Sequence, residues 1–157
     1  VIIATATIVL TKPQKTNLDI PECNEIESKL WRYDCYTNYA ANTKNEDICI
    51  ELKDKSATIS DFCYSKLAIK LKDPELCEKI ENKSEIPLYS STRSAYSECK
   101  TKIAITTKRE DLCSESKNLN EEGPCYIEIA KEKMDITICD KINLPEELDY
   151  QTNATQY

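Results

Sequence analysis

The stretch CYSKLAIKLKDPELC, residues Cys63–Cys77, carries the pattern that decides the fold. Its cysteines are 14 positions apart, and a large apolar residue and an alanine stand four and five positions after the first. Cysteine and the apolar residue share one helix face, and the small alanine lets a second backbone come close. Asp73 and Pro74 then provide a capping side chain and a first-turn proline for a second helix. The stretch therefore predicts a helical hairpin.

The same frame occurs in three further copies: CYTNYAANTKNEDIC from Cys35, CKTKIAITTKREDLC from Cys99 and CYIEIAKEKMDITIC from Cys125. Each copy keeps the alanine and has Ile or Leu directly before its second cysteine. Residues that favour a helix start precede the second cysteine by four positions in three copies: Asn45, Asp73 and Asp135. Arg109 stands there in the other copy, where Thr107 is predicted to cap instead. A constant frame between variable linkers is typical of stacked helical repeats.

A partial copy precedes these four. LDIPECNEIESK around Cys23 matches the second half of the frame around Cys77. Its first half is missing, because Val9 stands where the first cysteine would be. No strong turn residue separates this lone second helix from the next copy. We therefore expect one longer helix from about Ile20 to about Ala41.

Composition excludes several function classes. The chain has 28 acidic and 21 basic residues and a net charge of -7, which argues against binding nucleic acid or anionic lipid. It has one Gly and no His, so phosphate-cradling loops and Ser-His or Cys-His catalysis are not expected. Acidic pairs such as Glu121 and Glu122 are expected to be solvated or to cap helices. We predict no enzyme activity, no catalytic or metal-binding residue and no cofactor.

Nine cysteines in 157 residues indicate disulfides formed in an oxidising compartment, outside the cytoplasm or on the cell surface. Metal sites use close cysteine pairs, whereas the smallest gap between successive cysteines here is 12. We therefore expect disulfides rather than a metal.

Two pairing schemes are open. In the first, each copy closes its own loop, which uses Cys35, Cys49, Cys63, Cys77, Cys99, Cys113, Cys125 and Cys139 and leaves Cys23 unpaired or bonded to another subunit. In the second, the second helix of one copy bonds the first helix of the next, which leaves Cys139. The constant spacing favours the first scheme, because disulfide geometry tolerates a narrow range of Cα separations. Against it, the two cysteines of a frame are not equally far from the hairpin turn. Each closed loop contributes about 3 kcal/mol by loop-closure entropy.

The chain opens on VIIATATIVL, in which seven of ten residues are β-branched. Ten helical residues span about 15 Å, which is too short for a bilayer. The segment is interpreted as the outer end of a membrane anchor or signal, as a docking element for a neighbouring subunit, or as part of the chain's own core. We favour docking, with these candidate assembly residues: Val1, Ile2, Ile3, Ile8, Val9 and Leu10. Asn82 and Asn153 begin sequons for glycosylation.

The frame from Cys63 to Ile80 resembles cysteine-paired helical repeats of predicted secreted or surface proteins of archaea. The resemblance covers about Asp19 to Ile142 and implies a location rather than an activity.

The predicted fold is therefore an all-α, disulfide-stapled array of helical hairpins, a short solenoid with an extended apolar N-terminal segment. Its parts are residues 1–18 (segment and linker), 19–150 (repeat domain) and 151–157 (polar tail). We predict a subunit that assembles with copies of itself into a cell-surface filament, and that carries glycans. Membrane contact is expected only through an N-terminal anchor or during secretion. The alternative is a tethered or secreted repeat module that binds another protein.

Overall fold

The computed structural model describes residues 18–83, 94–116 and 119–142, and all regular structure in these ranges is helical. The all-α prediction is thereby confirmed. Four elements are long: α2 (Lys29–Thr43), α4 (Ala57–Leu71), α5 (Ala95–Thr107) and α7 (Leu119–Lys133). Five are short: α1 (Pro21–Asn24), α3 (Asp47–Lys53), the 3-10 helix η1 (Leu76–Lys79), α6 (Asp111–Glu115) and the 3-10 helix η2 (Ile136–Lys141).

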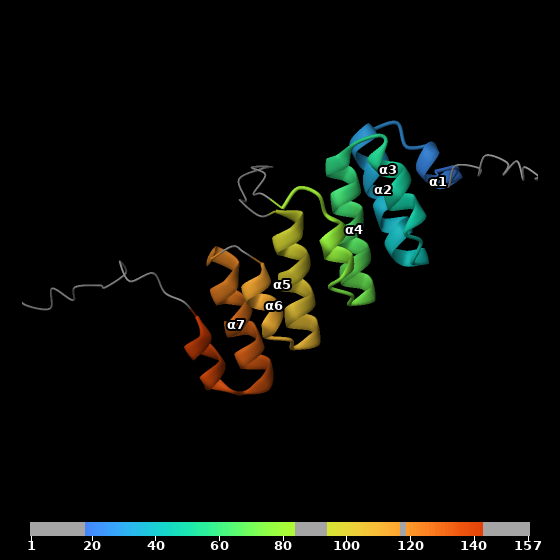
Figure 1. Cartoon of the computed structure of the whole chain (residues 1–157). Coiled ribbons are helices and arrows are strands. Elements are labelled where there is room, and N and C mark those ends of the chain that lie inside the picture. Colours follow the sequence, from blue (N-terminus) through green and yellow to red (C-terminus); the bar gives the residue numbers. More distant parts are fainter. Residues whose placement is uncertain (1–17, 84–93, 117–118, 143–157) are drawn as a thin grey trace, which may run out of the picture.

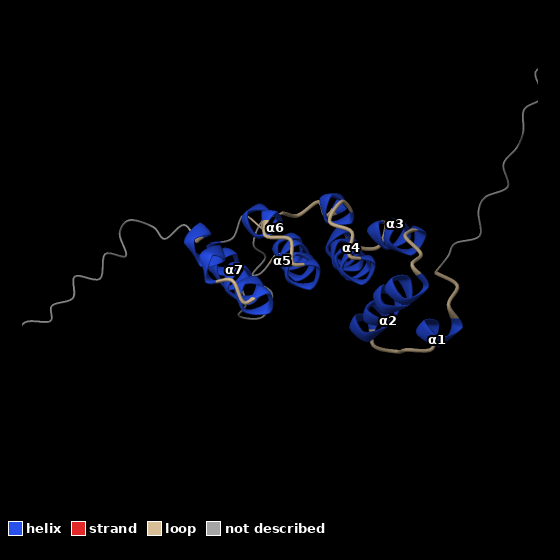
Figure 2. Ribbon diagram, turned by 90° about the horizontal axis from the view of Figure 1, so that it is seen from below, coloured by secondary structure: helices blue, strands red, loops and turns tan. Residues whose placement is uncertain are grey.

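The long helices lie side by side in chain order, from α2 at one end of the molecule to α7 at the other (Figure 1). The short helices α3, η1 and α6 each contact the long helix before them and the long helix after them. Viewed along the long helices, α3 lies to one side of α2, and α6 lies to the same side of α5 and α7 (Figure 2). The described chain therefore has a long-helix side and a short-helix side, with the core between them.

A turn of constant geometry joins each long helix to its short partner. The residue nine positions after the first cysteine of each frame has a positive φ of 54 to 57°: Lys44, Lys72, Lys108 and Met134. The backbone N–H of the following residue donates to the carbonyl of the frame's alanine over 3.0 Å: Ala40, Ala68, Ala104 and Ala130. This bond closes the helix end in the way a left-handed C-cap does. The left-handed conformation costs about 1–2 kcal/mol for a residue with a Cβ, so it is held by the surrounding hairpin.

The side chains predicted to begin the short helices accept backbone N–H groups at three of the four turns, and Asp135 is the N-cap of η2. The side-chain Oδ1 atoms of Asn45, Asp73 and Asp135 each accept the backbone N–H two residues on, over 3.0 Å. The predicted cap at Thr107 is wrong, because its hydroxyl donates 2.6 Å to the carbonyl of Ile103 within α5. Here the guanidinium of Arg109 pairs with Asp111 over 2.5 Å.

The longer helix expected from Ile20 to Ala41 is wrong. α1 ends at Asn24, and α2 begins at Lys29 after Ser28 in an extended conformation. The break lets the chain double back, so that Cys23 reaches Cys35 and the hydroxyl of Tyr36 donates to Asn24. Ser56 caps the next long helix, α4, by accepting the N–H of Ile59.

The favoured disulfide scheme is also wrong, since the bonds follow the second scheme: Cys23–Cys35, Cys49–Cys63, Cys77–Cys99 and Cys113–Cys125. Cys23 is thus bonded, and Cys139 is the free thiol. Each bond joins a short helix to the following long helix, with Cα atoms 5.4 to 6.0 Å apart. The reason lies in the turn, because Cys63 precedes the left-handed Lys72 by nine residues whereas Cys77 follows it by five. The constant spacing reflects the constant turn and not a covalent bond.

Bonded cysteines and the apolar frame residues form one continuous core. Leu67, Ile103 and Ile129, four positions after the first cysteines of the last three frames, are fully buried. The frame alanines Ala40, Ala68, Ala104 and Ala130 are buried as well, which fits their role at the close approach of two backbones.

Candidate assembly surfaces

Polar side chains link successive long helices at two of the described junctions. The Nζ atom of Lys66 on α4 lies 2.5 Å from Asp34 and 2.9 Å from Asn38, both on α2. At the α5–α7 junction, the hydroxyl of Thr101 donates 3.1 Å to the buried carboxylate of Glu121. Each long helix thus has one face for the helix before it and another for the helix after it.

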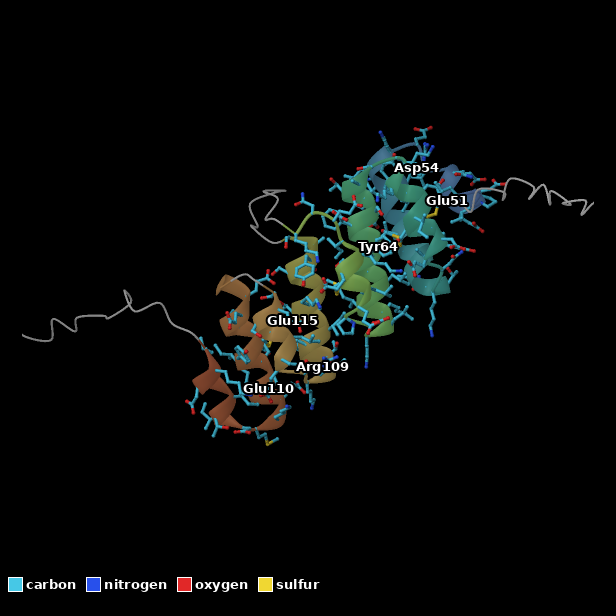
Figure 3. All side chains as sticks on the ribbon, viewed as in Figure 1. Glu51, Asp54, Tyr64, Arg109, Glu110 and Glu115 are labelled. Atoms are coloured by element: carbon cyan, nitrogen blue, oxygen red, sulfur yellow. A yellow bond between two sulfur atoms is a disulfide. The ribbon has the colours of Figure 1, made fainter. Side chains whose placement is uncertain are left out.

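Ion pairs link successive hairpins on the short-helix side. Glu46 pairs with Lys79, and at the equivalent positions of the last two hairpins Glu110 pairs with Lys141 over 2.5 Å. Lys133 also lies 2.5 Å from Glu110, and both ammonium groups lower the pKa of that carboxyl. Figure 3 shows Glu110, Arg109 and Glu115 on the α5–α7 half, with Tyr64 closer to the middle of the row.

The middle junction has different chemistry, because Lys100 stands where the other frames have tyrosine. Its side chain is buried, and its Nζ atom lies 2.8 Å from Glu78 and 2.7 Å from Glu115. Burial acts to lower the pKa of Lys100, but hydrogen bonds to Glu115 and Glu78 outweigh it and raise the pKa. Hydrogen bonds from Lys100, Lys83 and Tyr96 lower the pKa of Glu78 to about 2. We call Glu78, Lys83, Lys100 and Glu115 the central clamp, because their ion pairs connect η1, α5 and α6. The negative charges of the two glutamates balance the positive charges of the two lysines.

Two hollows open between consecutive long helices. The larger, of about 350 Å³, lies between α2 and α4 and is lined by Leu30, Tyr33, Ile59 and Phe62, with Asp34 and Lys66 among its polar residues. The smaller, of about 190 Å³, lies between α5 and α7 and is lined by Ile105 and Pro124 together with more polar groups. The α2–α4 groove is therefore the more apolar of the two.

The last described hairpin, α7 with η2, differs from the others in the residues on the side where the next hairpin of the row would lie. Counting from the first cysteine of each frame, position 2 holds Thr37, Ser65 and Thr101, then Ile127. Position 9 holds Lys44, Lys72 and Lys108, then Met134. Position 11 holds Glu46, Pro74 and Glu110, then Ile136.

These three apolar replacements are exposed. Ile127 is 40% exposed, Met134 95% and Ile136 78%, whereas Thr37 and Ser65 are buried at the equivalent of Ile127. Cys139 on η2 is partly exposed and free, while its equivalents Cys49, Cys77 and Cys113 are buried and bonded. We call the surface made by Ile127, Met134, Ile136 and Cys139 the α7–η2 face. An exposed group of apolar side chains such as this one indicates a contact surface.

The first long helix shows the complementary feature. Tyr39 on α2 is 42% exposed, although its equivalents Leu67, Ile103 and Ile129 are fully buried. Trp31 is 65% exposed, whereas Ala95 and Glu121 are buried at the equivalent positions of α5 and α7. Among the described residues, α2 has no long helix before it that covers these two side chains.

The predicted assembly residues Val1, Ile2, Ile3, Ile8, Val9 and Leu10 lie outside the described residues, as does Asn153. Asn82 is half-buried, and its backbone N–H donates 3.1 Å to Asp61. The α7–η2 face was not predicted, although the sequence shows Ile127 and Met134 where the other frames are polar, and Ile136 where two of the other three have Glu.

No protein-family model, curated protein or solved structure matches the chain. Within the described ranges, no helix combines the length and the apolar character that a membrane crossing requires. The same ranges contain no group of three or more His, Cys, Asp or Glu residues arranged to hold a metal ion. The four disulfides indicate an oxidising environment for the folded protein.

Proposed function

We propose that this protein is an extracellular structural subunit that assembles head to tail with copies of itself into a cell-surface filament. In this proposal the helical hairpins form a short solenoid, and each new copy continues the row of the previous one. The observation that carries the proposal is the pair of uncovered ends: Trp31 and Tyr39 at one, and the α7–η2 face at the other.

The contact is expected to propagate because the two ends are different surfaces. A contact between unlike patches of identical subunits produces an open polymer unless its rotation closes a ring. The uncovered end of α2 has the face that internal long helices turn toward the helix before them. The uncovered end of α7 has the face that they turn toward the helix after them. A second copy that follows the first along the row therefore adds the same kind of junction.

Disulfides and glycosylation sequons fit a subunit outside the cell. Every hairpin junction in the described chain has one disulfide, and such bonds persist where no cellular reductant is present. Glycans on Asn82 and Asn153 belong to the same proposal, because both asparagines begin sequons. An enzyme is not proposed, since the surfaces described above have packing contacts and ion pairs as their main features.

Negative-stain electron microscopy of the native protein, purified without reductant, tests the proposal. Regular filaments with a repeat close to the length of one helix row are expected. Dispersed single particles over a wide range of concentration and salt would contradict it, and sedimentation velocity would give the same answer in solution.

The α2–α4 groove favours a second candidate function, a secreted module that binds another protein. Its apolar lining of Leu30, Tyr33, Ile59 and Phe62 is suited to an apolar side chain of a partner peptide. Replacing Phe62 by Asp would abolish binding to such a partner while leaving filament formation intact. A variant that loses both properties would argue that the groove belongs to the assembly.

A further inference from the structure

We infer that the α7–η2 face receives the N-terminal segment Val1–Leu10 of a second copy of this chain. This inference rests on the proposed function and adds the N-terminal segment to the contact between the two uncovered ends. The α7–η2 face supplies Ile127, Met134 and Ile136, and the segment supplies its branched apolar side chains.

The residue types of the last hairpin point to an apolar partner. Inside the row, the next hairpin presents polar groups to positions 2 and 11: Lys79 meets Glu46, Lys141 meets Glu110, and the acidic Glu121 meets Thr101. At the last hairpin both positions are isoleucine, which cannot form such pairs. A charged residue brought to this face would find no such partner at these two positions. The apolar N-terminal segment brings no charged side chain.

The segment stands out against the rest of the chain in the same respect. Charged residues make up 31% of the sequence, yet residues 1–10 contain none. Burying exposed apolar groups on both sides stabilises a contact, because apolar area is removed from water. Uncharged surfaces gain this energy without the desolvation penalty of a buried charge.

The position of the segment in the sequence frame also agrees with a contact to the preceding copy in the row. The short helices α3, η1 and α6 each contain a bonded cysteine. In each case the long helix before it has a cysteine 14 residues earlier in the sequence. For α1 that position is Val9, so residues 1–17 precede α1 in the sequence as a long helix precedes each later short helix. At each internal junction, the cysteine of the long helix is bonded to the cysteine of the preceding short helix, as Cys63 is to Cys49. In the inferred contact, Val9 takes the place of a first cysteine beside the free Cys139 of another copy.

A triple variant of the full chain tests the inference on the receiving side. Ile127→Thr, Met134→Lys and Ile136→Glu together restore the residue types of the internal frames on exposed positions, so the fold is retained. This receiver variant should remain monomeric where the wild type forms filaments. Added to the wild type at one part in twenty, it should shorten the filaments severalfold, because it docks onto an end and then accepts no further copy. Ile50→Glu is the matched control, since Ile50 is exposed but lies outside both ends, and it should assemble normally.

A second variant tests the docking side. Ile3→Asp with Ile8→Asp places two charges in the segment and leaves the α7–η2 face unchanged. Neither this docking variant nor the receiver variant should self-associate, but a mixture should give a one-to-one heterodimer in sedimentation velocity. If the receiver variant forms filaments as long as the wild type, or the mixture stays monomeric, the inference is overturned while the filament function stands. If the wild type itself never polymerises, both fall together.

Discussion

Removing cysteines in matched pairs gives a direct measure of the disulfide connectivity. The variant Cys49→Ala/Cys63→Ala removes two bonded partners and therefore one disulfide. The variant Cys63→Ala/Cys77→Ala removes cysteines from two different bonds and therefore breaks both. All three cysteines are fully buried, so the loss of packing is similar in the two variants.

The magnitudes follow from the loops that the bonds close. Cys49 and Cys63 are 14 residues apart, and a loop of that size stabilises by about 3 kcal/mol through chain entropy. Cys77 and Cys99 are 22 residues apart, for which the same relation gives about 3.4 kcal/mol. The free energy of unfolding should therefore fall by about 3 kcal/mol in the first variant and by about 6 kcal/mol in the second, beyond the packing loss that they share.

Urea unfolding without reductant measures both values, and alkylation in denaturant followed by mass spectrometry counts the thiols. The first variant should have the single free thiol of Cys139, and the second should add those of Cys49 and Cys99. If the order of stabilities and the thiol counts were reversed, each frame would close its own loop and the hairpin geometry described above would be wrong.

Three further predictions concern the turns, the central clamp and the core. Lys72→Gly should stabilise the protein by up to about 1 kcal/mol in urea unfolding, because glycine relieves the left-handed turn, whereas Lys70→Gly inside α4 should destabilise it by about 1 kcal/mol. Equal losses in both variants would contradict the turn. The pKa of Glu78 is lowered from 4.5 to about 2, so its stabilising effect is present above pH 4.5 and is lost as the pH falls toward 2. Glu78→Gln should therefore flatten the dependence of the free energy of unfolding on pH in this range. An unchanged slope would contradict the clamp. The buried hydroxyl of Ser116 has no hydrogen-bond partner in the described part of the chain, so Ser116→Ala should raise the free energy of unfolding by about 1 kcal/mol, and a clear loss would reveal a partner.

Much of the fold could be predicted because one frame contains several independent signals. The cysteine, the apolar residue and the alanine define a helix face, and Asn45, Asp73 and Asp135 accept backbone N–H groups where the short helices begin. The disulfide pairing could not be predicted from spacing, since it depends on the distance of each cysteine from the turn. The left-handed residue at that turn is Lys or Met and not Gly, so composition gave no sign of it.

The candidate surfaces were predicted less well. The apolar N-terminal segment drew attention to one end of the chain, and its assembly residues, from Val1 to Leu10, lie outside the described residues. The other end required a comparison of the same position across four frames, which makes Ile127, Met134 and Ile136 stand out. The exposure of Tyr39 could not be read from its frame position, because that position is buried wherever a neighbouring hairpin covers it.

The pattern of disulfides also determines how the row would respond to a pulling force. Each bond joins a short helix to the next long helix, so tension bypasses the residues between bonded cysteines, such as 77 to 99. Extension is left to the stretches from Cys35 to Cys49 and their equivalents, each 14 residues long and therefore able to lengthen to about 50 Å at most. A fibre built from such rows would lengthen in steps by opening its left-handed turns. Its junctions would hold until a reductant cut them.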